Sequence, residues 1–120
     1  MDPMEVALRE QVVDGVDELQ QKFYLPWERC RYLPDNTQVE FVERGMRQLE
    51  IVFAGPLDKS KARRYRLIRH HGSAWVSLPR PWLQDRGVRN GDRIILFCYV
   101  GAPQTMLIRH EKKPAVGTTT

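Results

Sequence analysis

The hydrophobic positions at the start of the chain follow the period of a helix. Between residues 3 and 23, apolar side chains recur every three to four positions, which places them on one helix face. Asp2 is a favourable N-cap, and Pro3 suits the first helical position. The sequence therefore predicts an amphipathic helix over residues 3–23. Its apolar positions are Met4, Leu8, Val12, Val16, Leu19 and Phe23.

Two strand-like runs follow. Residues 38–43 and 48–54 place hydrophobic side chains at every second position, as expected for strands with one buried face. The residues between them include Gly45 and fit a hairpin loop. Gly55 and Pro56 end this unit, and residues 57–61 resemble a connector, so the sequence predicts a domain boundary there.

The second half contains the same kind of alternating pattern, with its predicted strands closer together. The pattern predicts strands over residues 64–70, 74–78, 92–100 and 104–110, with a short helix over 79–86. Pro79 suits the start of that helix and Gly87 its C-terminal cap. A unit of about 50 residues buries a marginal core by itself. The run 92–100 is apolar on both faces, which favours cover supplied by dimerisation.

These elements together predict an α+β fold. An N-terminal acidic helix and β-hairpin (residues 1–57) precede a small β-β-α-β-β barrel (residues 62–113), which is completed by dimerisation. Residues 114–120 contain a threonine run with nothing to bury, which predicts a flexible tail.

The two halves differ in charge. Residues 1–60 contain 7 Lys and Arg against 12 Asp and Glu, whereas residues 61–120 contain 12 against 3. A strongly basic half favours a polyanionic partner such as DNA. The alternative is a solvated basic surface that forms ion pairs with the acidic half, and charge alone does not separate the two.

An ordered string in the second half resembles a known family. Residues 72–79 (GSAWVSLP), Trp82-Leu83 and residues 87–92 (GVRNGD) are similar to the AbrB/MazE/SpoVT swapped-hairpin domain, in the version common in archaeal regulators. The match covers about residues 63–112, under half of the chain. Much of the motif is structural, because glycine permits the tight turns and proline ends a strand and opens a helix.

The resemblance implies a homodimer in which two chains exchange hairpins to close one β-barrel, with one basic surface on double-stranded DNA. Family members are mostly transcriptional regulators and antitoxins. In them, basic residues of the first strand and the following loop contact DNA. The corresponding positions here, with one serine nearby, are Arg64, Arg66, Arg69, His70, His71 and Ser73. The version of the motif suggests an archaeal or archaeal-virus source.

Two departures disfavour an antitoxin. The antitoxin branch usually has an arginine just before the hydrophobic-Pro pair, where this chain has Ser77. Toxin-binding tails normally follow the domain, whereas the extra sequence precedes it here. The leading hypothesis is thus a dimeric DNA-binding transcriptional regulator, whose N-terminal segment extends the dimer or receives another protein. The alternatives are a protein-interaction or assembly protein and an architectural DNA coater.

The candidate residues also have plainer interpretations. The arginines could form ion pairs on a solvated strand. His70 and His71, adjacent on a strand, point to opposite faces and lack further ligands for a metal. Trp27, Trp75 and Trp82 could stack on single-stranded bases, but Trp82 fits the core, and only Trp75 is left open. Cys30 and Cys98 are expected to be small buried hydrophobes.

Several classes are disfavoured by the sequence. It contains no nucleophile elbow, P-loop or dinucleotide-binding glycine pattern, so we expect no enzyme, no cofactor and no metal. It contains no apolar run long enough to span a bilayer and no secretory signal pattern, so we expect a cytoplasmic, nucleoid-associated protein without a membrane partner.

Overall fold

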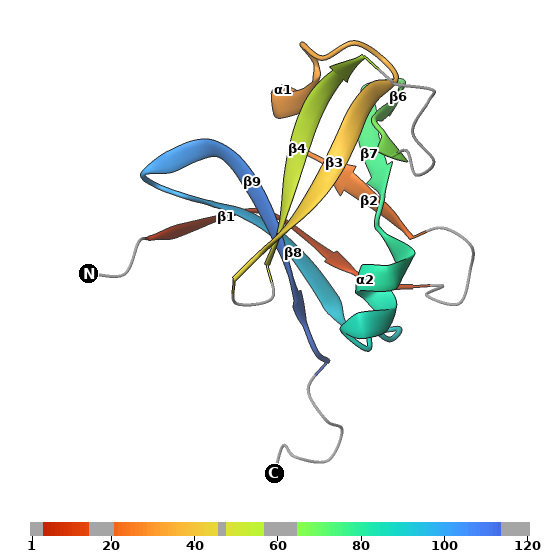
Figure 1. The fold of residues 1–120 in the computed structure, drawn as a ribbon, viewed down its shortest axis with the longest axis vertical. Helices are drawn as coiled ribbons and strands as arrows, with labels where there is room; N and C mark the ends of the chain where they lie inside the picture. Colours follow the sequence, from red (N-terminus) through yellow and green to blue (C-terminus); the bar gives the residue numbers. More distant parts are fainter. Residues whose placement is uncertain (1–3, 15–20, 46–47, 57–64, 114–120) are drawn as a thin grey trace.

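The protein is seen here in a computed structural model, which describes residues 4–14, 21–45, 48–56 and 65–113. These residues form nine strands and two short helices (Figure 1). The elements are β1 (Glu5–Val12), β2 (Lys22–Leu25), α1 (Trp27–Cys30), β3 (Thr37–Arg44), β4 (Gln48–Pro56), β5 (Tyr65–Arg66), β6 (Ile68–His70), β7 (Ser73–Ser77), α2 (Arg80–Asp85), β8 (Arg93–Tyr99) and β9 (Ala102–Glu111).

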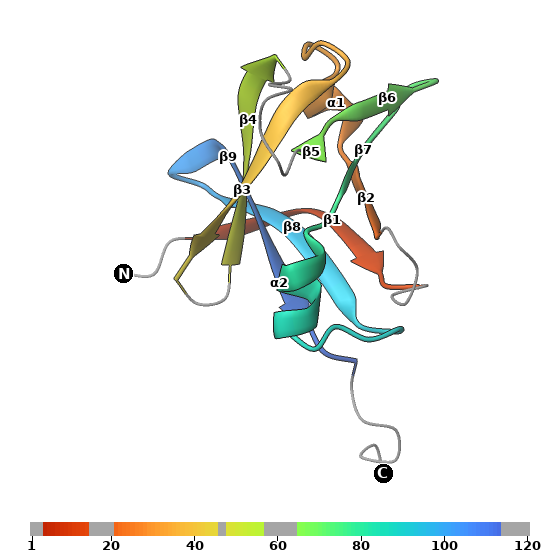
Figure 2. The ribbon, with the colours of Figure 1, turned by 45° about the vertical axis from the view of Figure 1, so that its right-hand side comes forward.

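The strands form two antiparallel sheets. The larger sheet has the order β1-β8-β9-β4-β3-β5, and the smaller has the order β2-β7-β6. Figure 2 shows the small sheet beside the upper part of the large one, with α2 below it. Both sheets combine strands from the two halves of the chain. Within the described residues, neither helix is long and apolar enough to cross a membrane.

The predicted fold class is wrong, first of all at the N-terminus. The predicted helix over residues 3–23 is replaced by β1 and β2, while residues 15–20 lie outside the described part of the chain. Tertiary pairing explains why residues 5–12 form a strand and not a helix. β1 pairs along its length with β8, and the apolar strand β8 requires a partner on that edge. Met4 and Val12, apolar positions of the predicted helix, are 73% and 59% exposed.

The prediction of a separate barrel completed by a second chain is also wrong. In the structure β8 lies between β1 and β9, and β9 pairs on its other edge with β4. Both faces of β8 are buried within one chain, since Ile94 and Leu96 face the main core while Ile95 and Phe97 join a second cluster. The homodimer and the division at residues 57–61 stay predictions, but the cover that motivated a dimer comes from the first half.

Other local predictions are confirmed. The hairpin over residues 38–54 is β3 and β4, and the predicted short helix is α2. Gly87 follows α2 with φ 64°, and Gly91 turns the chain into β8 with φ 92°. These backbone angles lie in the left-handed region, which glycine adopts without a steric penalty. Turn and cap chemistry is local, so it can be predicted without the tertiary partners.

The two halves of the chain repeat one order of elements. The first half contributes β1, β2, α1, β3 and β4, and the second contributes β5 with β6, β7, α2, β8 and β9. The large sheet is palindromic under this exchange, because β1-β8-β9 at one end corresponds to β5-β3-β4 at the other. The chain therefore has an internal pseudo-two-fold axis.

The strand registers obey the same symmetry. In the small sheet Lys22 pairs with Ser77 and Tyr24 pairs with Trp75, so exchanging the halves leaves the pairing unchanged. Phe23, which lies between them, pairs with Val76 on the axis. On the large sheet the axis passes through the pair of Glu50 in β4 and Leu107 in β9, which is flanked by the pairs of Leu49 with Ile108 and Ile51 with Met106.

Backbone hydrogen bonds repeat across the axis as well. The Val13 N–H donates to the Asp92 carbonyl at 2.7 Å, and the Leu67 N–H donates to the Thr37 carbonyl at 2.9 Å. The N–H groups of Gly91 and Asn36 return bonds to the carbonyls of Val13 and Leu67, respectively. Asn36 shares the left-handed backbone of Gly91, with φ 62°. Thr37 is therefore the counterpart of Asp92.

One hydrophobic core joins the two halves. It contains Phe23, Leu25, Val39 and Ile51 from the first half together with Leu67, Val76, Leu78, Ile94, Leu96 and Ile108 from the second, all at most 4% exposed. Burial of large apolar side chains is the dominant stabilising contribution to folding. The described part of the chain is thus held as a single unit by residues of both halves.

Candidate nucleic-acid interface

The outer face of the small sheet is built by strand alternation. Phe23, Leu25, Ala74 and Val76 point into the core, so their neighbours along β2 and β7 point outward. Cross-strand pairing adds two residues of β6 to the same side. We define the small-sheet face as Lys22, Tyr24, Ile68, His70, Ser73, Trp75 and Ser77.

Two cations, one on this face and one beside it, lie against its aromatic rings. The Lys22 Nζ lies 4.5 Å from the centroid of the Trp75 ring, and the Arg9 guanidinium lies 5.8 Å from that of Tyr24. Tyr24 is 38% exposed and Trp75 is partly buried. None of the seven residues of the small-sheet face carries a carboxylate. A cationic face with aromatic rings is suited to a polyanion.

The tip between β6 and β7 adds two histidines. His71 adopts a positive φ of 47° and Gly72 follows with 77°, so the tight turn begins at His71. The rings of His70 and His71 consequently lie together, with centroids 3.9 Å apart, and the expectation of opposite faces is wrong here. Among the described residues, no group of three or more His, Cys, Asp and Glu is placed to hold a metal ion.

The structure distributes the candidate arginines differently. Arg66 is exposed, and its Nη1 donates to the Asn36 Oδ1 at 3.1 Å. Arg69 points to the other side of β6, where its guanidinium lies over the Trp27 ring and donates to the Leu33 carbonyl. The Arg69 side chain is therefore used in contacts within the chain. Arg64 lies outside the described residues, while His70, His71 and Ser73 are exposed.

On the outer face of the large sheet, two arginines are paired with carboxylates. Arg93 bridges Glu10 at 3.0 Å and Glu111 at 3.2 Å. Arg109 contacts Glu5 and Glu111, and the hydrogen bond that Arg109 donates to Glu5 is the main cause that raises the pKa of the Arg109 guanidinium. The ion pairs expected between the acidic and basic halves thus occur on this sheet, where they occupy arginines that could otherwise meet a polyanion.

The remaining sequence candidates lie in the core. Trp82 is only 4% exposed, which confirms its predicted place. Cys30 and Cys98 are free and buried, as predicted. Burial raises the pKa of the Cys30 thiol to about 11, although Arg69 and Arg29 act in the opposite direction. A protonated, buried thiol is a poor nucleophile.

Sequence reasoning missed Arg9 and Lys22, because the predicted helix contained them, and it missed Tyr24, which directly follows that helix. A signal was present in the Leu-Pro pair at residues 25–26, which recurs at 78–79. Pro26 and Pro79 both precede short helices with nearly the same backbone, at φ −60° and −63°. That repeat would have equated residues 22–25 with residues 75–78, which lie in a predicted strand.

A second polar cluster surrounds Asp92. This buried carboxylate accepts hydrogen bonds from the backbone N–H groups of Arg89 at 2.9 Å and Lys113 at 2.8 Å, and its Oδ2 lies 2.7 Å from the His110 Nε2. Burial alone would raise the pKa of Asp92, but these hydrogen bonds outweigh it and hold the pKa at about 2. The carboxylate is therefore ionised at neutral pH and ties the end of β9 to the start of β8.

Replacing Asp92 by asparagine is expected to lower the free energy of unfolding by about 2 kcal/mol at pH 7, because charge-assisted hydrogen bonds are lost. The folded-state pKa of about 2 lies below the ordinary value, so the stabilisation is full above about pH 4 and declines as the pH falls toward 2. Urea unfolding at pH 7 and pH 2.5 measures this. A difference between wild type and D92N that does not shrink at the lower pH would contradict it.

Comparisons with known proteins identify no relative: no family model, no curated protein and no solved structure matches this chain.

Proposed function

We propose that this chain is a DNA-binding protein that contacts duplex DNA through the small-sheet face. The observation that carries the proposal is the contrast between the two sheets. The large sheet pairs Arg93 and Arg109 with carboxylates, whereas the small-sheet face presents Lys22 and His70 with no carboxylate among its residues. Phosphate contacts supply much of the affinity of DNA-binding proteins. The resemblance to the AbrB/MazE/SpoVT domain supports a role as a transcriptional regulator.

The pseudo-two-fold axis adds geometric support. It passes through the pair of Phe23 and Val76, in the middle of the small sheet. Two-fold proteins bind DNA with their axis on that of the duplex, so that each half meets one half-site. A single chain presents such a surface here, with Lys22 as the counterpart of Trp75 and Tyr24 as the counterpart of Ser77. Because the halves differ, we propose a preferred site that is not a palindrome.

The surface around the face sets the expected salt dependence. Lys22 lies on the face, Arg9 lies against its Tyr24 ring, and Arg66 on β5 is a further exposed cation. If these three cations each neutralise one phosphate, the logarithm of the binding constant should fall with the logarithm of salt concentration with a slope of roughly −3. Fluorescence anisotropy on a labelled 20-base-pair duplex between 50 and 300 mM KCl measures this slope. A slope near zero would reject the phosphate-contacting surface.

The same assay separates the regulator from its alternatives. A regulator should bind a selected operator duplex on the order of 10³-fold more tightly than random duplex, whereas an architectural coater should bind both alike. A single strand of equal length tests whether Trp75 and Tyr24 act as stacking platforms instead. Tighter binding of the single strand would replace the duplex as the proposed target.

A further inference from the structure

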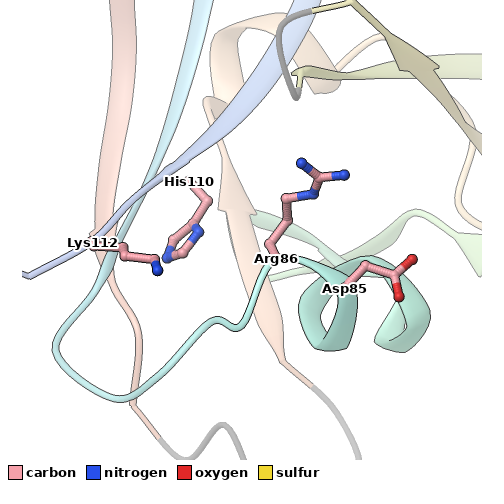
Figure 3. A pocket seen from close by; sticks show the side chains of 4 residues that line it. All are labelled: Asp85, Arg86, His110 and Lys112. Carbon is pink, nitrogen blue, oxygen red and sulfur yellow. The ribbon is translucent and has the colours of Figure 1, made fainter.

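A pocket lies between the end of α2 and the end of β9. It has a volume of about 360 Å³ and is lined by Asp85, Arg86, His110 and Lys112 (Figure 3). In Figures 1 and 2, α2 and the end of β9 lie below, while β6 and its tip lie at the top. The pocket is therefore separate from the tip of the small sheet.

The cations of this pocket have no acceptors within the described part of the chain. The Arg86 Nε is buried and has no hydrogen-bond partner there. A buried donor without an acceptor costs free energy, which a ligand oxygen would recover. Arg93 and Arg109, in contrast, are each held by two carboxylates. Arg86 thus differs from the arginines that hold the large sheet together.

His110 is held in place from the opposite side. Asp92 is ionised and only accepts hydrogen bonds, so the His110 Nε2 carries the proton that it donates across 2.7 Å. The histidine side chain is only 6% exposed. A buried carboxylate that fixes the tautomer and orientation of a histidine is a common device for holding a ligand-binding imidazole.

The internal symmetry allows the Asp92–His110 pair to be compared with the corresponding residues of the first half. In the first half Thr37 occupies the place of Asp92, as the backbone hydrogen bonds show. Phe53 occupies the place of His110, because Phe53 pairs with Val39 as His110 pairs with Ile94. The same fold is therefore built at the counterpart corner without a charged pair. Asp92 and His110 are a feature of one corner and are not a requirement of the architecture.

We propose that this pocket binds a small molecule through a phosphate group. Arg86 offers a planar set of donors that fits phosphate oxygens, Lys112 adds a second positive charge, and His110 contributes a fixed ring. The volume is in the range of small-ligand sites. Asp85, an exposed lining residue, opposes the passage of a continuous polyanion, which favours a free small phosphate over the DNA backbone.

The test is a titration of the ¹⁵N-labelled full chain with inorganic phosphate at constant ionic strength, with chloride as the replaced anion. We expect saturable amide shifts near residues 85–89 and 110–113, with a dissociation constant on the order of millimolar. Arg86→Gln and Lys112→Gln should each weaken binding at least about five-fold. Arg80→Gln removes an exposed arginine of the same helix outside the pocket, so it should leave the constant unchanged.

A second variant keeps the test independent of folding. The double change Asp92→Thr and His110→Phe introduces the residues of the first half, so it should fold, and it should weaken phosphate binding by a similar factor. Unsaturable shifts, or equal losses in R80Q and R86Q, would overturn the proposal. If a DNA duplex displaced phosphate from the pocket, the site would belong to the DNA surface, and the small-molecule proposal would be wrong.

Discussion

Reversing the charge of Arg9 and Lys22 together, by Arg9→Glu and Lys22→Glu, should weaken duplex binding about 100-fold at roughly 0.1 M salt. Each reversal removes a phosphate contact and adds a repulsive charge, and a factor of 10 for each corresponds to about 1.4 kcal/mol. Both side chains lie against the rings of the small-sheet face, where Lys22 covers Trp75 and Arg9 covers Tyr24. The salt slope should become shallower by about two, because two phosphate contacts are lost.

A matched control separates this effect from a change in net charge. Arg80→Glu with Arg89→Glu alters the charge by the same amount at two exposed positions that are not part of the small-sheet face. This control should reduce affinity only a few-fold through long-range electrostatics. Equal losses in the two double variants, measured by anisotropy on one duplex, would show that the small-sheet face has no special role.

Phe23→Ala should lower the free energy of unfolding by about 3 to 5 kcal/mol. Phe23 is fully buried and lies on the pseudo-two-fold axis against Val76, so its removal leaves a cavity where the two halves meet. Because one core joins the halves, unfolding should remain a single transition. Urea denaturation followed by the indole N–H NMR signal of Trp82, which belongs to the second half and is observed separately from the signals of Trp27 and Trp75, should report the full loss.

Tyr24→Ala is the control on the same strand. Tyr24 points outward and is 38% exposed, so its truncation should cost less than about 1 kcal/mol. A Phe23→Ala protein in which Trp82 unfolds at the wild-type urea concentration would contradict the account. That result would mean that the second half is stable without the first.

The sequence predicted the elements that depend on local chemistry. The β3–β4 hairpin follows from alternation around Gly45, and α2 follows from Pro79 at its start and Gly87 at its end. The N-terminal helix was wrong because its apolar spacing resembles a helical face by coincidence. The conformation of residues 5–12 is determined by their pairing with β8, which lies more than 80 positions away in the chain. No local pattern carries that information.

The candidate site was predicted only in part. His70, His71 and Ser73 are exposed at the tip or on the face, but Arg69 packs on Trp27. Strand alternation puts Arg69 opposite to His70, yet its use in packing depends on α1, whose position the sequence does not reveal. Lys22 was missed because its strand partner lies in the second half. The charge difference between the acidic and basic halves has another role than the one expected. Acidic residues of the first half form ion pairs with arginines of the second half across the large sheet.

The most direct test of the proposed function is a map of the DNA-contacting residues. Titration of the ¹⁵N-labelled protein with a duplex should shift the amides of β2, β7 and the β6–β7 tip, and it should leave the outer face of β8 and β9 unchanged. Shifts concentrated on β8 and β9, or no shifts at all at 50 mM salt, would contradict the proposal that the small-sheet face binds DNA.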